Sequence, residues 1–297
     1  MGVPVDIGTN SESVLTVAHR LWSGYPPISG RDPIALRVMV EGIGVKPAPI
    51  PSLLGQQHLM SIVRDSHNFA VCDLAASLGY ARVTEDVALD GEYFRYHFLE
   101  AIIYTMMEAR YFCPVHASCI ALGGRAILLC GDSGAGKTSL AYACAKRGWT
   151  FLSGDATCIV RDRPEPSVAG RPFSIRFRSE ARHLFPELGV FTPERRANGK
   201  LDMEIDTQEL GLATALESRP VGLVFINRQR TGGARIGPFS REEAFEQCSR
   251  TICYGNADIR AAQTKALREF LTLPVAQLTY SDLDEAECAL RRIATAA

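Results

Sequence analysis

The sequence lacks a strong charge imbalance, a long apolar run and a recognisable export signal. Its 297 residues carry a formal net charge of −1, so there is no bulk electrostatic attraction to nucleic acid or to an anionic membrane. The longest apolar stretch, near 101–107, is interrupted by Glu108 and Arg110 and is well short of a membrane span. The N-terminus has no basic region followed by an apolar run, so no secretory signal is expected. We therefore expect a cytoplasmic protein with neither nucleic acid nor membrane among its partners.

Paired cysteine spacings are also missing. The nine cysteines are odd in number, are scattered and form no CxxC pair; they stand at positions 72, 113, 119, 130, 144, 158, 248, 253 and 288. This pattern argues against a disulfide framework or a structural zinc site and for a reducing compartment. Cys130 and Cys144 have apolar neighbours, so we expect small buried side chains there rather than reactive thiols.

The composition that is present is that of a globular α/β protein. Hydrophobic residues make up 46% and charged residues 22%, and the length suits one large domain or two ordinary ones. Helical spacing is predicted over 11–23 and 92–110, and short strands are predicted within 35–42, 67–75 and 81–89. We predict a small N-terminal α/β domain over residues 1–112 and a second domain over 113–297.

The second half alternates strands and helices more regularly, which is typical of an α/β domain. Apolar runs predict strands at 124–130, 149–153 and 220–227, and helices are predicted at 137–147, 241–254 and 257–273. Gly148 stands where a glycine commonly ends a helix. The stretch 216–223 is interpreted as a connection into a core strand.

Between a predicted strand and a predicted helix lies a match to G-x-x-x-x-G-K-[ST]. Its glycines let successive backbone N–H groups point inward around phosphates, and the following helix directs its N-terminal dipole at the same anion. Lys137 is expected to reach the β- and γ-phosphates, and the Thr138 hydroxyl is expected to bind Mg²⁺. An ordinary glycine-rich turn is the alternative, but the strand before it and the helix after it favour a triphosphate site. The predicted nucleotide-binding residues are Gly131, Asp132, Ser133, Gly134, Ala135, Gly136, Lys137, Thr138 and Ser139.

The motif's neighbours resemble one family. His116-Ala117-Ser118, the loop, Arg147-Gly148 and Asp155 follow one another as in HPr kinase/phosphorylase, over about 45 residues. The resemblance implies a kinase that uses ATP and Mg²⁺ to phosphorylate a serine or another hydroxyl. It also implies a P-loop domain shaped like phosphoenolpyruvate carboxykinase rather than like a Ras-type GTPase, and assembly into oligomers, commonly hexamers in that family.

The family typically has two consecutive acids where this chain has Gly154-Asp155. There, one carboxylate is the general base toward the acceptor hydroxyl and another supports the metal. The resemblance therefore implies that Asp155 is the general base, a metal ligand together with Thr138, or both. Alternatively, a displaced acid such as Asp162 takes one of these roles. A turn-forming aspartate after Gly154 is the alternative for Asp155.

Two further groups have competing interpretations. The resemblance implies that His116 positions Asp155 or the γ-phosphate, whereas a buried histidine bonded to the backbone is equally compatible with the sequence. A basic cluster could supply a residue that stabilises charge in the transition state, or it could be a solvated face. Its members are Arg176, Arg178, Arg182, Arg195, Arg196 and Lys200. The resemblance favours Lys200 for the first role, because related proteins often have a basic residue in a Gly-Lys step like Gly199-Lys200.

The acceptor is not encoded in these motifs. A protein or peptide serine is the first interpretation, and a small molecule such as a free amino acid or sugar is the alternative. A non-catalytic ATP-binding sensor, in which Gly154 has abolished transfer, is the third.

Overall fold

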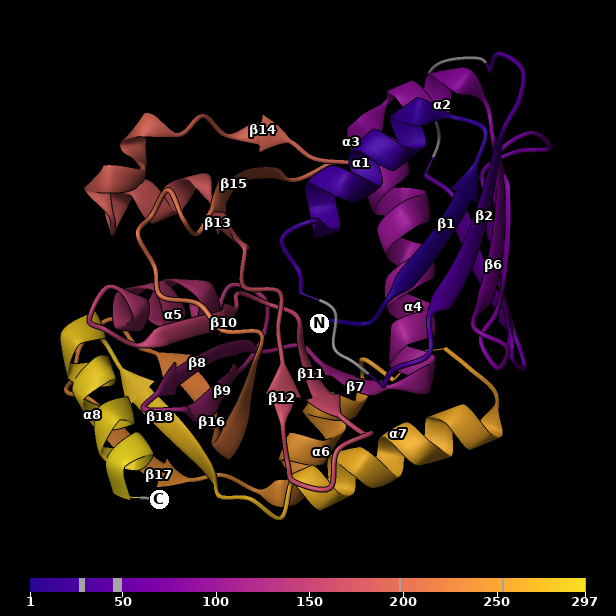
Figure 1. Cartoon of the computed structure of the whole chain (residues 1–297). Helices are drawn as coiled ribbons and strands as arrows, with labels where there is room; N and C mark the ends of the chain where they lie inside the picture. Colours follow the sequence, from indigo (N-terminus) through magenta and orange to yellow (C-terminus); the bar gives the residue numbers. More distant parts are fainter. Residues whose placement is uncertain (27–29, 45–49, 198, 253, 297) are drawn as a thin grey trace.

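The computed structural model describes residues 1–26, 30–44, 50–197, 199–252 and 254–296 as a mixed α/β protein. Its strands form three sheets, and Figure 1 shows the first sheet with its helices as one lobe beside a larger lobe built on the second sheet. None of the helices in the described part of the chain has the length and apolarity that a membrane span needs. All eight described cysteines are free thiols; Cys130 and Cys144 are buried as predicted, and Cys253 lies outside the described residues.

The first sheet has six strands in the order β1-β2-β6-β5-β4-β3. Pairing is parallel from β1 to β2 and from β2 to β6, and antiparallel across the rest. Alternate residues of each strand face the core, as in β2, where Ile34, Leu36 and Val38 are buried. The strands are β1 (Val5–Thr9), β2 (Ile34–Val40), β3 (Ser52–Gln56), β4 (Leu59–Val63), β5 (Phe69–Asp73) and β6 (Leu78–Val83).

The helices of this lobe cover the inner face of that sheet (Figure 1). The helix predicted over 92–110 is present, but a π-helical turn interrupts it between two α-helical segments. The predicted strand 81–89 is wrong in its second half, because Thr84 is the N-cap of a helix whose first turn has Glu85 and Asp86, an acidic pair that favours a helix start. The helices are α1 (Glu12–Trp22), α2 (Glu85–Leu89), α3 (Gly91–Phe94), the π-helix η1 (Arg95–Glu100) and α4 (Ala101–Arg110).

The second sheet has nine strands, with β9, β16 and β18 parallel at its centre. Its main path is β10-β8-β9-β16-β12-β11-β7, and β18 joins β16 to β17. The predicted strands 124–130, 149–153 and 220–227 are all in it. The strands are β7 (Phe112–Val115), β8 (Ser118–Leu122), β9 (Arg125–Cys130), β10 (Thr150–Ser153), β11 (Thr157–Val160), β12 (Val168–Ala169), β16 (Glu217–Arg228), β17 (Arg235–Pro238) and β18 (Val275–Tyr280).

Helices pack on both faces of this sheet, as expected for an α/β layer arrangement (Figure 1). Successive side chains of β9 point to opposite faces of the sheet and into two separate hydrophobic cores. Ile127 and Leu129 pack with α5 and α8, whereas Leu128 packs with α6 and α7. The helices are α5 (Lys137–Ala145), α6 (Arg241–Ser249), α7 (Ala257–Phe270) and α8 (Leu283–Ala296). The segment 216–223, interpreted as a connection, already belongs to β16 from Glu217 onward.

A third, small sheet packs on α5 of the second lobe and contacts η1 of the first lobe through the ion pair between Arg95 and Glu204. Its strands are β13 (Ser174–Arg178), β14 (Glu194–Arg195) and β15 (Leu201–Asp206), with the 3₁₀ turns η2 (Ser179–His183) and η3 (Pro186–Val190) between β13 and β14. The domain boundary predicted after residue 112 stays a prediction. The core of the first lobe continues into Phe112, Cys158 and Val160 of the second sheet.

Candidate functional site

The glycine-rich loop connects the carboxyl end of β9 to the first residue of α5. Gly134 and Gly136 have φ values of 90° and 97°, in the left-handed region that favours glycine. Gly136 is the N-cap of α5, so the chain passes directly from the loop into a helix whose first N–H groups face the loop. A strand, a left-handed glycine turn and a helix N-terminus therefore meet at one point, and this is an arrangement suited to an anion.

Lys137 is buried over this loop. Its exposure is 6%, and its Nζ donates hydrogen bonds to the carbonyl oxygens of Gly131 at 2.8 Å and Asp132 at 3.1 Å. Burial lowers the pKa of Lys137, while the nearby Asp155 and Asp132 act in the opposite direction. The ammonium group is held above the loop by backbone acceptors, with no carboxylate as its ion-pair partner among the described residues.

The carbonyl of Gly154 anchors the connection between β10 and β11 to the loop helix. Thr138 Oγ1 donates to this oxygen at 3.0 Å, and the Ser118 hydroxyl donates to the same oxygen. Asp155 is thereby placed next to the first turn of α5, with its side chain exposed. A Cβ built on Gly154 would lie 3.7 Å from Phe151 and Thr138 atoms, which is ordinary contact, so this position has room for a larger residue.

His116 follows β7 and lies beside Asp155. Its side chain is exposed, so the alternative of a buried histidine does not describe it, although it does have a hydrogen bond to the Asp155 backbone. Partial desolvation and the charge of Lys137 lower the pKa of His116, and the Asp155 carboxylate opposes them. The imidazole is therefore biased toward its neutral form near pH 7.

These residues line one cavity of about 410 Å³. His116, Ser133, Gly134, Gly136, Lys137, Thr138, Ser139 and Asp155 all border it, whereas the exposed Asp132 does not, nor do Gly131 and Ala135. Its basic side chains outnumber its acidic ones: they are Lys137, Arg176, Arg178, Lys200 and Arg228 against Asp155, Glu180 and Asp202. A concave surface with a surplus of positive charge suits a polyanion.

The basic cluster divides. Arg176, Arg178 and Lys200 line the cavity, and Arg178 Nη2 also contacts Ser133 Oγ at 3.1 Å. Arg182 instead donates to the Phe191 carbonyl, and Arg195 donates to the Gly199 carbonyl at 3.3 Å. The displaced acid considered above, Asp162, is ion-paired with Arg31 at 2.7 Å and is not part of the cavity wall.

One cavity residue, Arg228, and one buried neighbour of the loop, Tyr280, were missed in the sequence. Arg228 ends β16, which pairs parallel to β9, and Tyr280 ends β18, which pairs parallel to β16. A Cβ on Gly136 would lie 3.2 Å from Tyr280 Oη, which is buried and lacks a hydrogen-bond partner among the described residues. The sequence did contain a signal for Arg228, which directly follows the predicted strand 220–227, because parallel sheets bind ligands at the carboxyl ends of their strands.

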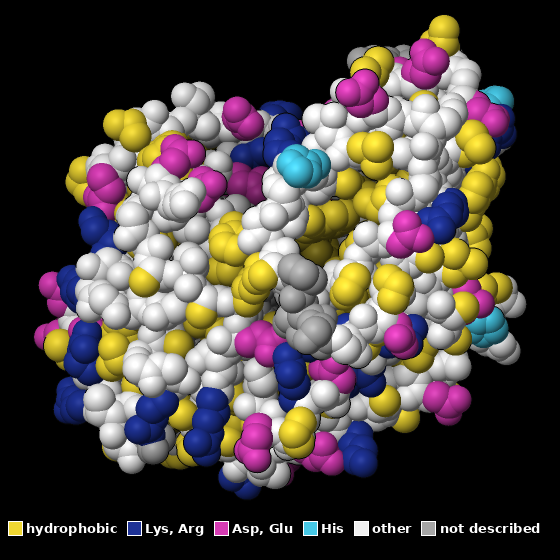
Figure 2. All heavy atoms as spheres, in the orientation of Figure 1, with side chains coloured by type: hydrophobic (Ala, Val, Ile, Leu, Met, Phe, Trp, Pro, Cys, Tyr) yellow, Lys and Arg dark blue, Asp and Glu magenta, His cyan; other side chains and the backbone are white. Residues whose placement is uncertain are grey.

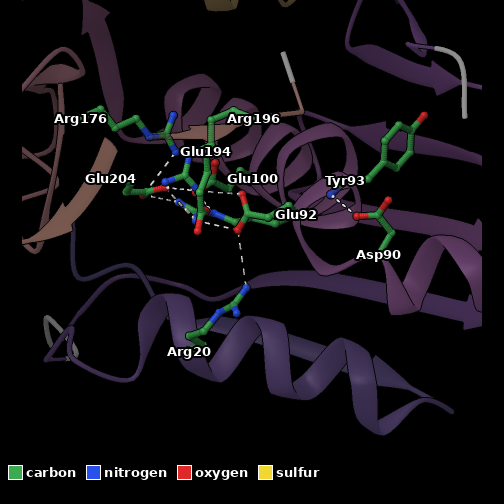
Figure 3. A network of polar contacts seen from close by, with 10 residues as sticks. Arg20, Asp90, Glu92, Tyr93, Glu100, Arg176, Glu194, Arg196 and Glu204 are labelled. Atoms are coloured by element: carbon green, nitrogen blue, oxygen red, sulfur yellow. Dashed lines mark hydrogen bonds and ion pairs between the residues drawn. The ribbon is translucent and has the colours of Figure 1, made fainter. Parts of the chain in front are cut away.

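A second cavity of about 420 Å³ adjoins the first and shares Thr138, Asp155 and Arg176 with it. One wall comes from β13 and β15, and the other comes from α1, η1 and α4 of the first lobe. An ion-pair network at this junction, shown in Figure 3, joins the two walls. Arg95 contacts both oxygens of Glu204, at 2.7 and 3.1 Å, and Glu100 at 3.2 Å.

Comparison with known proteins yields a limited likeness. No protein-family model matches the chain, and no curated protein matches it. The solved structure of the Hpr(Ser) kinase/phosphatase from Coxiella burnetii is similar over 60% of this chain and 88% of its own, with 12% identity and a TM-score of 0.32.

Proposed function

We propose that the chain is an ATP-dependent kinase, resembling HPr(Ser) kinase, that transfers the γ-phosphate to a hydroxyl group of its acceptor. The observation that carries the proposal is the convergence of the glycine loop, Lys137, Thr138 and Asp155 on one positively lined cavity. In this proposal, residues 113–297 are the P-loop catalytic domain. A protein or peptide serine and a small-molecule hydroxyl are both acceptors that this chemistry serves.

Phosphate binding is assigned to the loop and to the basic side chains around it. The loop N–H groups and the N-terminus of α5 would hold the β- and γ-phosphates, and Lys137 would exchange its backbone acceptors for phosphate oxygens. Arg176, Arg178 and Lys200 face the same space and would neutralise the charge of the transferred group.

Thr138 and Asp155 are the oxygen ligands that the site offers to Mg²⁺. The residues fit such an ion, because a hydroxyl and a carboxylate next to bound phosphates are the ligands Mg²⁺ prefers, and water completes its shell. Bound there, Mg²⁺ would neutralise phosphate charge. Among the described residues no cluster of three His, Cys, Asp or Glu side chains forms a separate metal centre.

Asp155 is the proposed general base. The acceptor oxygen would form a bond to the γ-phosphorus while the bond from that phosphorus to the bridging oxygen of ADP breaks, and the hydroxyl proton would pass to the Asp155 carboxylate. His116, hydrogen-bonded to the Asp155 backbone, would position this residue. Such a step depends mainly on placement and electrostatics, which the shared wall of the two cavities provides.

The test measures ATP binding and ADP release for the wild type, Lys137→Ala and Asp155→Asn with Mg²⁺ and a cell lysate as acceptor pool. Lys265→Ala and Asp258→Asn are matched controls, because both side chains are exposed on α7, on the other face of the sheet. We expect Lys137→Ala to lose ATP binding, and Asp155→Asn to bind ATP but release ADP at least 100-fold more slowly. Unchanged ADP release by Asp155→Asn would remove the base from the proposal.

A second candidate is a non-catalytic nucleotide sensor. The observation in its favour is Gly154, which puts no carboxylate where the resemblance leads one to expect the first of two acids. A sensor would bind ATP with the same dependence on Lys137 but would release no ADP during prolonged incubation with any acceptor pool. Turnover that depends on Asp155 excludes the sensor.

A further inference from the structure

The second cavity lies where an acceptor would have to lie. It meets the cavity around the glycine loop at Thr138, Asp155 and Arg176, so a molecule in it can present a hydroxyl to Asp155 from the side opposite the loop. The first lobe closes it through Arg20, Tyr25 and Tyr104. The first lobe is therefore part of the wall of this site.

Most of the arginines that line this cavity already have carboxylate partners, as Figure 3 shows. Arg176 pairs with Glu204 at 3.4 Å, and Arg20 pairs with Glu92 at 3.7 Å. Arg196 contacts Glu92 at 3.4 Å, and Arg95 pairs with Glu204. Although burial pushes the pKa of Glu204 upward, the Arg95 hydrogen bond and the charges of Arg176 and Arg196 hold it at about 2. Each of these four arginines therefore has a carboxylate partner within the protein.

Arg171 is the exception. Its guanidinium lies over the Tyr104 ring, 4.3 Å from the centroid, and has a hydrogen bond to the Tyr104 hydroxyl. Glu100, Glu108 and Asp155 are near enough to interact with its charge, but no carboxylate of the described residues lies within ion-pair distance of it. Within the described part of the chain, the Tyr104 hydroxyl is the one hydrogen-bond partner of this half-buried guanidinium, which leaves other donors for a planar anion.

Arg171 also stands between this cavity and a third, apolar one of about 290 Å³. The two share Tyr25, Tyr104 and Arg171. The remaining lining of the third cavity includes Val3, Val5, Ile7, Ala18, Trp22 and Met107. The face in Figure 2 is hollowed beside α1 and β1, and hydrophobic side chains line the hollow. An anion at Arg171 therefore has polar space with Asp155 on one side and apolar space on the other.

We propose that the second cavity binds the phosphate acceptor and that the acceptor is a hydroxyl compound with a carboxylate, which Arg171 binds, and an apolar group, which the third cavity takes. This inference rests on the proposed kinase function. A carboxylate fits better than a phosphate ester, because the single charge of Arg171 balances a monoanion but leaves a dianion with an unbalanced charge beside Glu100 and Asp155. The partner cation for such a carboxylate is already in place and held by Tyr104.

The test uses two probe pairs, phenyllactate with its amide and N-benzoylserine with its amide, titrated calorimetrically into the full chain with ADP and Mg²⁺. Each pair differs only in the charge that Arg171 is proposed to bind. A hydrogen-bonded charge pair contributes about 1.5–3 kcal/mol, so we expect each acid to bind roughly 10- to 100-fold more tightly than its amide. Arg171→Gln should abolish this preference, and Arg171→Lys should retain part of it. Arg37→Gln is the control and should leave the preference unchanged, because Arg37 is exposed on the first sheet, is paired with Asp6 and lines none of the three cavities.

Equal binding of acid and amide overturns the proposal, as does absence of binding by all four probes at 10 mM or tighter binding of phosphoserine than of N-benzoylserine. ATP affinity of Arg171→Gln should equal that of the wild type, which also shows that the variant is folded. Lys137→Ala separates the two ideas, because it should lose ATP binding while it keeps the preference for acids. Acid-selective binding without ADP release in the wild type would refute the kinase function and leave the carboxylate site standing.

Discussion

Replacing Gly136 with alanine should disturb nucleotide binding more than it disturbs folding. Gly136 has a φ of 97° and is the N-cap of α5, directly before Lys137. A side chain there must adopt a left-handed conformation, and its Cβ would lie 3.2 Å from Tyr280 Oη. Tyr280 is 1% exposed, so it has little freedom to move away.

The magnitude follows from these two terms. A left-handed conformation costs an L-residue roughly 1–2 kcal/mol, and alanine recovers about half of that by restricting the unfolded chain. The close contact with Tyr280 adds about 1 kcal/mol if the loop stays in place, as overpacking does elsewhere. The loop can instead relax away from Tyr280, which redirects its N–H groups. Loss of one charge-assisted hydrogen bond to a phosphate then weakens ATP binding by about 10- to 100-fold.

Gly148→Ala is the matched control. Gly148 has a φ of 86°, but no atom lies within 4 Å of the position that a Cβ would take there, and it follows the other end of α5. Both variants should therefore lose about 1 kcal/mol of unfolding free energy from backbone strain in urea titrations, while only Gly136→Ala loses ATP affinity in calorimetry. If Gly148→Ala weakens ATP binding as much as Gly136→Ala, the effect is global and the reasoning about the loop is wrong.

Three further variants test the packing around the site. Glu204→Gln should cost about 3 kcal/mol of unfolding free energy at pH 7, because it removes the carboxylate that the half-buried Arg95, Arg176 and Arg196 share. Since the folded pKa is lowered to about 2 from 4.5, the wild type should lose this contribution as pH falls through that interval, measured by urea titration. Glu108→Gln should stabilise the protein, because burial raises the folded pKa of Glu108 to about 7 and its ionised form is therefore unfavourable in the folded state. The variant should be about 1–2 kcal/mol more stable than the wild type at pH 8 and equally stable at pH 4. Equal stability of the two proteins at both pH values would contradict the raised pKa of Glu108. Trp149→Phe should lose about 1–2 kcal/mol, because Trp149 Nε1 donates to Glu287 at 2.7 Å in a buried position; a Tm unchanged by calorimetry would show that this bond contributes nothing.

The sequence predicted the elements around the loop well because the signals there are local. The apolar run before Gly131, the helix-forming residues after it and Gly148 as the helix stop each act within a few residues, and β9 and α5 follow them closely. The break at Thr84 was missed because an apolar pattern continued across it while the acidic first turn started a helix.

Residues contributed by long-range pairing could not be predicted in this way. Arg228 reaches the loop because β16 pairs parallel to β9 about a hundred residues earlier. The general rule for strand ends indicated this edge of the sheet, but no local pattern encodes the register that brings Arg228 to the loop. Arg171 precedes β13 in a segment without a motif, and its special status comes from the absence of a carboxylate partner among the described residues. Such a property exists only once the side chains of both lobes have been placed.

The arrangement of the cavities gives the small first lobe a role that its own sequence does not suggest. Arg95 of the π-helical turn η1 contacts Glu204 of β15, and π-turns within α-helices are frequent at functional sites. The ion pair between Arg95 and Glu204 joins the first lobe to the small sheet, and residues from both sides line the cavity that contains Arg171 and Asp155. A loosened network should therefore change how an acceptor is placed before it changes how ATP is held, because the glycine loop lies in the second lobe alone.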